Sequence, residues 1–240
     1  MAYYYYDNNG GGSQRRGFMS NVPKATRNLI IINVLVFVAT LLNQNLMVST
    51  FGLFYPSSRF FHWWQPLTYM FMHGGFWHIL FNMYTLFLFG SAVERIIGTK
   101  KFLIFYFICG LFAAGMQIGV QAIEAASYAN GVELGAQAAV QNLSNLMRTP
   151  TVGASGAIYG ILIGYAMIFP DPRLTLIFPP VTLKAKTMVI VFAAIELITG
   201  VNGLESGIAH FAHLGGMLIG WIVILYWKSK GILFDKDRWI

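Results

Sequence analysis

Three apolar segments of this sequence carry polar side chains of the types needed for acyl transfer. A serine hydroxyl is a weak nucleophile at neutral pH and needs a neighbouring base, usually a neutral imidazole, to take its proton. Ser155 stands at the start of one apolar segment, and His213 lies inside another. Polar groups are costly inside hydrocarbon, so their presence there indicates a function. We therefore predict that Ser155 is a nucleophile and that His213 is its base.

A second pair of polar residues could stabilise the oxyanion that forms when a serine attacks an amide carbonyl. His78 and Asn82 are four residues apart, so a helix would present both on one face. An imidazole N–H, a carboxamide and the backbone N–H of Ser155 at a helix start are suitable fixed donors. We expect these groups to form the oxyanion hole.

Other hydrolytic chemistries have little support in the sequence. His210 and His213 are spaced as HxxH, but no third ligand has a spacing suited to a metal. There is no HExxH motif, and the single Cys109 allows neither an internal disulfide nor a thiolate cluster. We expect neither a metal nor a cofactor.

The rest of the chain reads as membrane-spanning helices that hold these groups. Of its 240 residues, 56% are hydrophobic and 10% are charged, more apolar surface than one soluble core could bury. A helix needs roughly 20 apolar residues to cross hydrocarbon, and six segments approach this length, at about 27–47, 76–94, 102–123, 153–170, 187–204 and 207–227. We predict an all-α membrane protein with a six-helix domain over 27–228, a disordered tail over 1–26 and a short tail over 229–240.

Charge predicts the orientation of these helices. Of the 16 Lys and Arg residues, only Arg59 and Arg148 fall on one side of the predicted spans. The excess on the other side places both termini in the cytoplasm. The net charge of +7 is then explained by topology, so we expect membrane lipid and no nucleic acid as a partner. This topology, with no targeting leader, fits a bacterial inner membrane.

Small residues supply a reason for the serine and histidine helices to meet. Gly156, Gly160 and Gly164 repeat every four residues on one segment, and Gly216 and Gly220 do so on the other. Such small-xxx-small stripes allow helix backbones to approach closely in lipid. At about 1.5 Å of rise per residue, Ser155, His78 and His213 all lie within roughly 10 Å of the outer boundary. We expect them to share one layer.

These motifs resemble the rhomboid family of intramembrane serine proteases from about residue 59 to 228. The resembling pieces are His73, His78-xxx-Asn82, Gly90 and Glu94, then Gly-Ala-Ser155-Gly156 with Tyr159, and Ala-His213-xx-Gly216-xxx-Gly220. The sequence departs from the family at Gln65, where many members have an arginine after the tryptophan of the first loop.

The resemblance implies a six-transmembrane-helix rhomboid bundle that cleaves transmembrane segments of other membrane proteins near their outer end. It implies a dyad of Ser155 and His213 with no acidic third member. It also implies that Tyr159 stacks on the histidine ring, that Gly156 is a supporting residue of the site, and that His78 and Asn82 serve the oxyanion hole. The fifth span and the first external loop are the candidate gates for substrate.

Two other functions remain open on the sequence alone. One is a catalytically inactive relative that binds transmembrane helices, although such relatives typically lose the serine or the histidine. The other is a small transporter or channel built around the intramembrane carboxylates Glu94 and Glu196. We interpret Glu94 as a hydrogen-bonded structural anchor, and we assign no role to Glu196.

Overall fold

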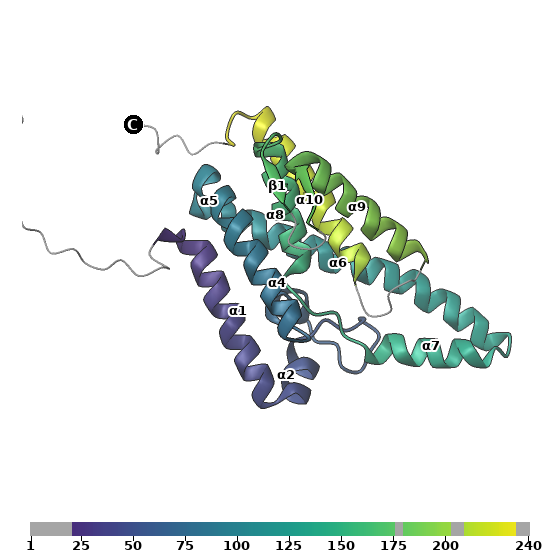
Figure 1. The fold of residues 1–240 in the computed structure, drawn as a ribbon. Helices are drawn as coiled ribbons and strands as arrows, with labels where there is room; N and C mark the ends of the chain where they lie inside the picture. The colour runs from purple at the N-terminus through teal and green to yellow at the C-terminus, as the bar shows by residue number, and fades with distance from the viewer. Residues whose placement is uncertain (1–20, 176–179, 203–208, 234–240) are drawn as a thin grey trace, which may run out of the picture.

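The computed structural model describes residues 21–175, 180–202 and 209–233, which are mostly helical (Figure 1). The α-helices are α1 (Lys24–Leu42), α2 (Gln44–Phe51), α3 (Gln65–Thr68), α4 (Phe76–Thr85), α5 (Ser91–Ile97), α6 (Thr99–Glu133), α7 (Gln137–Arg148), α8 (Ser155–Ile168), α9 (Ala185–Asn202) and α10 (His210–Ser229). A 3₁₀ turn, η2 (Tyr69–Phe71), follows α3, and a π-helical segment, η3 (Leu86–Gly90), joins α4 to α5.

Four helices of the described part of the chain are long and apolar enough to cross a membrane. They are α1, the continuous α4–η3–α5 helix over Phe76–Ile97, α6 and α10. The apolar helix α8 has only 14 residues, or about 21 Å at 1.5 Å per residue, and α9 has 18 residues. The prediction of six spans therefore stays a prediction for α8 and α9.

The expected all-α architecture is wrong in one detail between α8 and α9. Strands β1 (Arg173–Thr175) and β2 (Thr182–Lys184) form an antiparallel pair in which Leu174 lies opposite Leu183. The Thr175 and Thr182 hydroxyls are 2.9 Å apart across the pair. Such cross-strand pairs stabilise the short antiparallel pair of strands between α8 and α9.

The first helix differs from its prediction at both ends. It begins at Lys24, so the predicted tail boundary at residue 26 falls inside the helix. It ends at Leu42 because Asn43 leaves helical geometry, with φ −150°, and its side chain accepts a hydrogen bond from Leu46 N at 3.1 Å. This Asn43 cap starts the separate helix α2. Residues 1–20 and 234–240 of the predicted tails lie outside the described residues.

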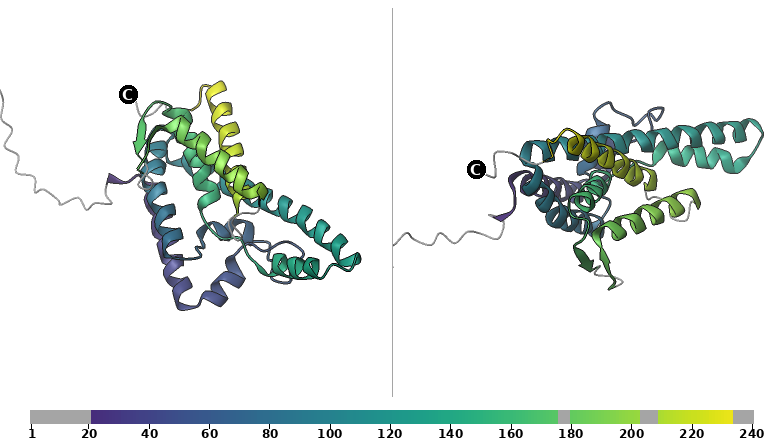
Figure 2. Two further views of the ribbon diagram at one scale, coloured as in Figure 1. Left: turned by 45° about the vertical axis from the view of Figure 1, so that its right-hand side comes forward. Right: turned by 90° about the horizontal axis from the view of Figure 1, so that it is seen from above.

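The third predicted span is also longer than expected. At 1.5 Å per residue, the 35 residues of α6 extend about 52 Å, well beyond a hydrocarbon core of about 30 Å. A turn at Gly135, where φ is +81°, reverses the chain into α7. The α6–α7 hairpin projects from the bundle, as both views in Figure 2 show.

Glu94 ties the start of α1 to α5 and α6, as interpreted from the sequence. Its carboxylate accepts hydrogen bonds from the backbone N–H groups of Ala25 and Thr26 at 3.0 and 2.8 Å. The hydroxyls of Thr26 and Thr99 donate to it at 2.8 and 2.7 Å. The fully buried carboxylate thus satisfies N–H groups that a helix start leaves without intrahelical partners.

The loop between α2 and α4 is anchored to its own backbone through Gln65, the position at which the sequence departs from the family pattern. Gln65 is fully buried, accepts a hydrogen bond from Phe54 N at 3.2 Å and donates one to Phe60 O at 2.8 Å. Trp64 Nε1 donates to Thr50 O at 2.9 Å. A neutral carboxamide can both donate and accept, so it can hold two turns of the loop together.

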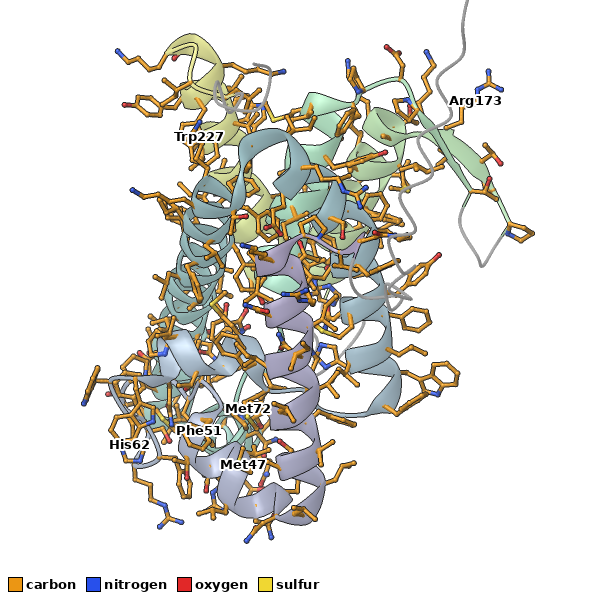
Figure 3. The ribbon with its side chains drawn as sticks, turned by 90° about the vertical axis from the view of Figure 1, so that its left-hand side faces the viewer. Met47, Phe51, His62, Met72, Arg173 and Trp227 are labelled. Atoms are coloured by element: carbon orange, nitrogen blue, oxygen red, sulfur yellow. The ribbon has the colours of Figure 1, made fainter. Side chains whose placement is uncertain are left out.

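Basic residues gather at one end of the helices. Figure 1 places the start of α1, the end of α5, the β-hairpin and the end of α10 at the same end. Figure 3 shows Arg173 and Trp227 there, with Met47, Phe51 and His62 at the opposite end. Lys228 donates to Met167 O at 2.7 Å at the basic end. This separation is the one that a positive-inside topology requires.

We predict that Glu94→Gln destabilises the fold by about 2 kcal/mol, because charge-assisted hydrogen bonds are lost and an amide N–H₂ faces buried donors. The thermal unfolding midpoint in detergent micelles would measure the change. Glu133→Gln, at an exposed position at the end of α6, is the matched control and should leave the midpoint unchanged. Equal midpoints for both variants would contradict the anchoring role.

Candidate active site

Ser155 is the first residue of α8, and a constrained backbone leads into it. Gly153 has a φ of +133°, and a Cβ there would lie 2.8 Å from Nε2 of His78. The Gly153 N–H donates to Tyr69 O at 3.0 Å. Two further backbone hydrogen bonds, of 2.9 and 2.8 Å, join Leu53 to Thr151. The loop between α2 and α4 therefore fixes the approach to the serine.

Helices α8 and α10 touch through their glycines, as the small-residue stripes predicted. A Cβ on Gly216 would lie 1.9 Å from the carbonyl oxygen of Gly156. A Cβ on Gly220 would lie 3.0 Å from the Cα of Gly160. Only glycine permits this backbone contact, which fixes the separation of the two helices.

This contact brings Ser155 and His213 together. Nε2 of His213 lies 2.7 Å from Oγ of Ser155. The Tyr159 ring stacks on the imidazole with centroids 4.4 Å apart and planes 13° apart, the contact that the family resemblance implied. The hydroxyl and the imidazole are within hydrogen-bonding reach for proton transfer.

His78 and Asn82 line the same cavity as Ser155, a space of about 1020 Å³. The Gly74 N–H donates to Nδ1 of His78 at 3.4 Å, so a neutral ring carries its proton on Nε2, the atom close to Gly153. Nδ2 of Asn82 is buried and has no hydrogen-bond partner among the described residues. Buried donors normally have hydrogen-bond partners. The unpartnered amide of Asn82 is therefore suited to donate to the oxygen of a carbonyl group bound in the cavity.

His73 supports His78 from the side. The two rings meet edge to face with centroids 5.0 Å apart, and His73 is buried. Burial, with a smaller contribution from His78, lowers the pKa of His73 to about 3. His73 is therefore neutral at physiological pH, in line with a structural role.

Sequence reasoning missed one member of the site. Glu196, on α9, places Oε1 3.0 Å from Nδ1 of His213, and the Tyr159 hydroxyl donates to the same oxygen. Oε2 lies 2.6 Å from Nδ1 of His210. The family resemblance implied no acidic third member, and the sequence assigned no role to this carboxylate. An intramembrane carboxylate was the available signal, but the sequence did not indicate which helix it faces.

The cavity also has an unexpected polar wall. Side chains of α6 and α7 line it, namely Gln117, Gln121, Glu124, Tyr128, Asn142 and Asn145. The segment between the predicted third and fourth spans is thus part of the cavity wall. Among the described residues, no cluster of three or more His, Cys, Asp or Glu side chains has a geometry suited to a metal ion.

Comparison with known proteins identifies the family. A model of the Rhomboid domain matches residues 61–230, more than half of the chain. The chain belongs to the rhomboid family. Membership and the long apolar helices make this rhomboid an integral, multi-pass membrane protein.

Several relatives carry protease names. The chain is 29% identical over 212 residues to the Rhomboid protease AarA of Providencia stuartii, covering 82% of this rhomboid and 70% of that protein. It is 29% identical over 163 residues to the Putative rhomboid protease YdcA of Bacillus subtilis, covering 68% of each. It is 30% identical over 166 residues to the human mitochondrial Presenilin-associated rhomboid-like protein, covering 67% of this chain and 38% of that one. Because relatives occur in bacteria and mitochondria, the bacterial location stays a prediction.

We predict that Gly216→Ala lowers both stability and activity, since its Cβ would overlap the Gly156 carbonyl and push α8 away from α10. The loss should be about 1–3 kcal/mol, as for other overpacked sites, and is measured as a lower thermal unfolding midpoint. The matched control is Gly119→Ala on α6, where a Cβ meets nothing within 4 Å. It should be neutral or stabilising by up to about 1 kcal/mol. A Gly216→Ala protein as stable and active as the control would contradict the close contact.

Proposed function

We propose that this rhomboid is an intramembrane serine endopeptidase in which Ser155 is the nucleophile and His213 the general base. The observation that carries the proposal is the 2.7 Å distance between Ser155 Oγ and His213 Nε2. The protease names of its bacterial relatives support the same reaction class.

The reaction follows from the positions of the donors and acceptors. Ser155 Oγ attacks the substrate carbonyl while His213 Nε2 takes its proton. The oxyanion that forms accepts hydrogen bonds from the Ser155 backbone N–H, His78 Nε2 and Asn82 Nδ2. His213 then protonates the leaving amine, and water hydrolyses the acyl-enzyme with the same imidazole as base.

The substrates we propose are transmembrane segments of other membrane proteins, cut near the outer interface. A helical backbone shields its carbonyls, so the segment must unwind before attack. An unwound strand exposes backbone N–H and C=O groups that hydrocarbon cannot satisfy. The polar side chains Gln117, Gln121 and Asn145 of the cavity wall can supply partners for them. Small or helix-breaking residues near the cut should therefore favour cleavage.

The proposal includes a six-span topology with both termini in the cytoplasm. The gathering of basic residues at the end of the bundle opposite His62 supports it (Figure 3). A bacterial inner membrane is the proposed location. No separate observation favours an inactive helix-binding protein or a transporter. The carboxylate of Glu94 accepts hydrogen bonds from backbone N–H groups, and that of Glu196 contacts the tyrosine and histidines around Ser155.

We predict that Ser155→Ala and His213→Ala each reduce cleavage at least about 1,000-fold, because nucleophile and base act as a unit. The measurement is cleavage of a fluorescent transmembrane substrate by purified protein in liposomes. Ser229→Ala, at the other end of α10, and His62→Ala, in the exposed loop, are matched controls and should cleave normally. Undiminished cleavage by Ser155→Ala or His213→Ala would refute the proposal, whereas loss of activity in every variant would indicate misfolding.

We predict that Asn82→Ala lowers kcat by about 100- to 1,000-fold with little change in KM, because oxyanion donors act mainly in the transition state. His78→Ala should behave similarly. Asn130→Ala, exposed on α6, removes the same side chain away from Ser155 and should leave kcat unchanged. An effect confined to KM would assign His78 and Asn82 to substrate binding instead.

A further inference from the structure

We propose that Glu196 is a positioning residue for His213. Its carboxylate holds the imidazole in the tautomer that can accept the Ser155 proton and stabilises the imidazolium formed during attack. This inference rests on the proposed protease function and adds an acidic third member to the pair of serine and histidine.

The geometry places the carboxylate and the serine on opposite nitrogens of one ring. Nε2 of His213 lies 2.7 Å from Ser155 Oγ, and Nδ1 lies 3.0 Å from Glu196 Oε1. The side chains of His213 and Glu196 are only 11% and 9% exposed, so water screens this contact little. The Nδ1 atom has no aligned hydrogen bond in this arrangement. A small rotation of the imidazole would align its N–H with the carboxylate.

The chemistry requires a particular tautomer. Nε2 accepts the hydroxyl proton only when it carries none itself, so the proton of the neutral ring must sit on Nδ1. A carboxylate beside Nδ1 favours that proton, and it attracts the positive charge that appears when Nε2 is protonated. The carboxylate itself remains ionised throughout, so the proton passes only from Ser155 to His213 and then to the leaving amine.

Two further side chains hold the carboxylate in place. The Tyr159 hydroxyl donates to Oε1, and His210 Nδ1 lies 2.6 Å from Oε2. The Tyr159 ring also stacks on His213, so one residue contacts both the imidazole and its carboxylate. These contacts orient Glu196 and offset the cost of burying its charge.

The same contacts also join α9 to α8 and α10, which suggests a competing role as a latch on a gate helix. The two roles predict opposite results. Loss of a latch would ease the entry of substrate and raise activity or change KM. Loss of a positioning carboxylate would lower kcat at unchanged KM. The 3.0 Å approach of Oε1 to the catalytic imidazole favours the positioning role.

The test compares Glu196→Gln, Glu196→Asp and the control Glu133→Gln in liposomes with a fluorescent transmembrane substrate. We expect Glu196→Gln to lower kcat at least about tenfold, with KM changed less than about twofold, because the amide carries no charge. Glu196→Asp should recover part of the loss, since it restores the carboxylate at a slightly greater distance. Glu133→Gln, exposed at the end of α6, should match the wild type.

A second measurement determines the tautomer of His213 and does not depend on an activity assay. The chain has five histidines, so the imidazole nitrogen resonances of ¹⁵N-histidine-labelled protein can be assigned with a His213→Gln variant. We expect Nδ1 of His213 to be protonated in the wild type and the population to shift towards Nε2 protonation in Glu196→Gln. Should Glu196→Gln fail to fold, Tyr159→Phe keeps the stacked ring and removes only the hydroxyl bound to Glu196. That variant should show a smaller fall in kcat and a smaller shift in the same direction.

The outcomes separate this inference from the proposed function. Unchanged or raised kcat in Glu196→Gln, with an unchanged tautomer, would overturn the positioning role, and raised activity would assign Glu196 to the latch. Cleavage by Ser155→Ala at the wild-type rate would instead refute the protease proposal itself. Loss of cleavage in Ser155→Ala with full kcat in Glu196→Gln would support the protease proposal and refute only the positioning role of Glu196.

Discussion

The contact between the Gly156 carbonyl and Gly216 determines the geometry of the whole site. No Cβ fits between the two backbones, so α8 and α10 lie as close as helices can. In lipid no hydrophobic effect draws apolar helices together, and close packing of small residues takes its place. The hydroxyl of Ser155 and the imidazole of His213 project from these two helices beside the contact and therefore meet at 2.7 Å.

Two buried carboxylates show how polar groups are accommodated within this bundle. Glu94 accepts hydrogen bonds from backbone N–H groups at the start of α1 and so joins three helices at one end. Glu196 lies among side chains that include Tyr159 and His210, beside the imidazole of His213. Each charge is offset by donors, as burial requires. The first arrangement combines backbone N–H donors with two threonine hydroxyls, and the second includes groups that can exchange protons.

The segments outside the central helices complete the cavity. The loop between α2 and α4 is held by Gln65 and is bridged through Leu53 to Thr151, which leads into Gly153 and Ser155. The α6–α7 hairpin adds polar side chains to the lining of the cavity. A peptide freed from its helix needs both features, because its backbone groups must find partners away from bulk water.

The sequence by itself was enough to predict that Ser155 and His213 meet and which helices bring them together. Helical periodicity places Gly156 and Gly160 on one stripe and Gly216 and Gly220 on another, and these positions depend only on local geometry. The full length of α6 and the neighbours of Glu196 were decided by the tertiary structure. In α9, Ile195 and Leu197 on either side of Glu196 are both half exposed, so apolar residues do not mark an inner face. In a helix apolar on several sides, only packing against α8 and α10 decides that Glu196 faces His213.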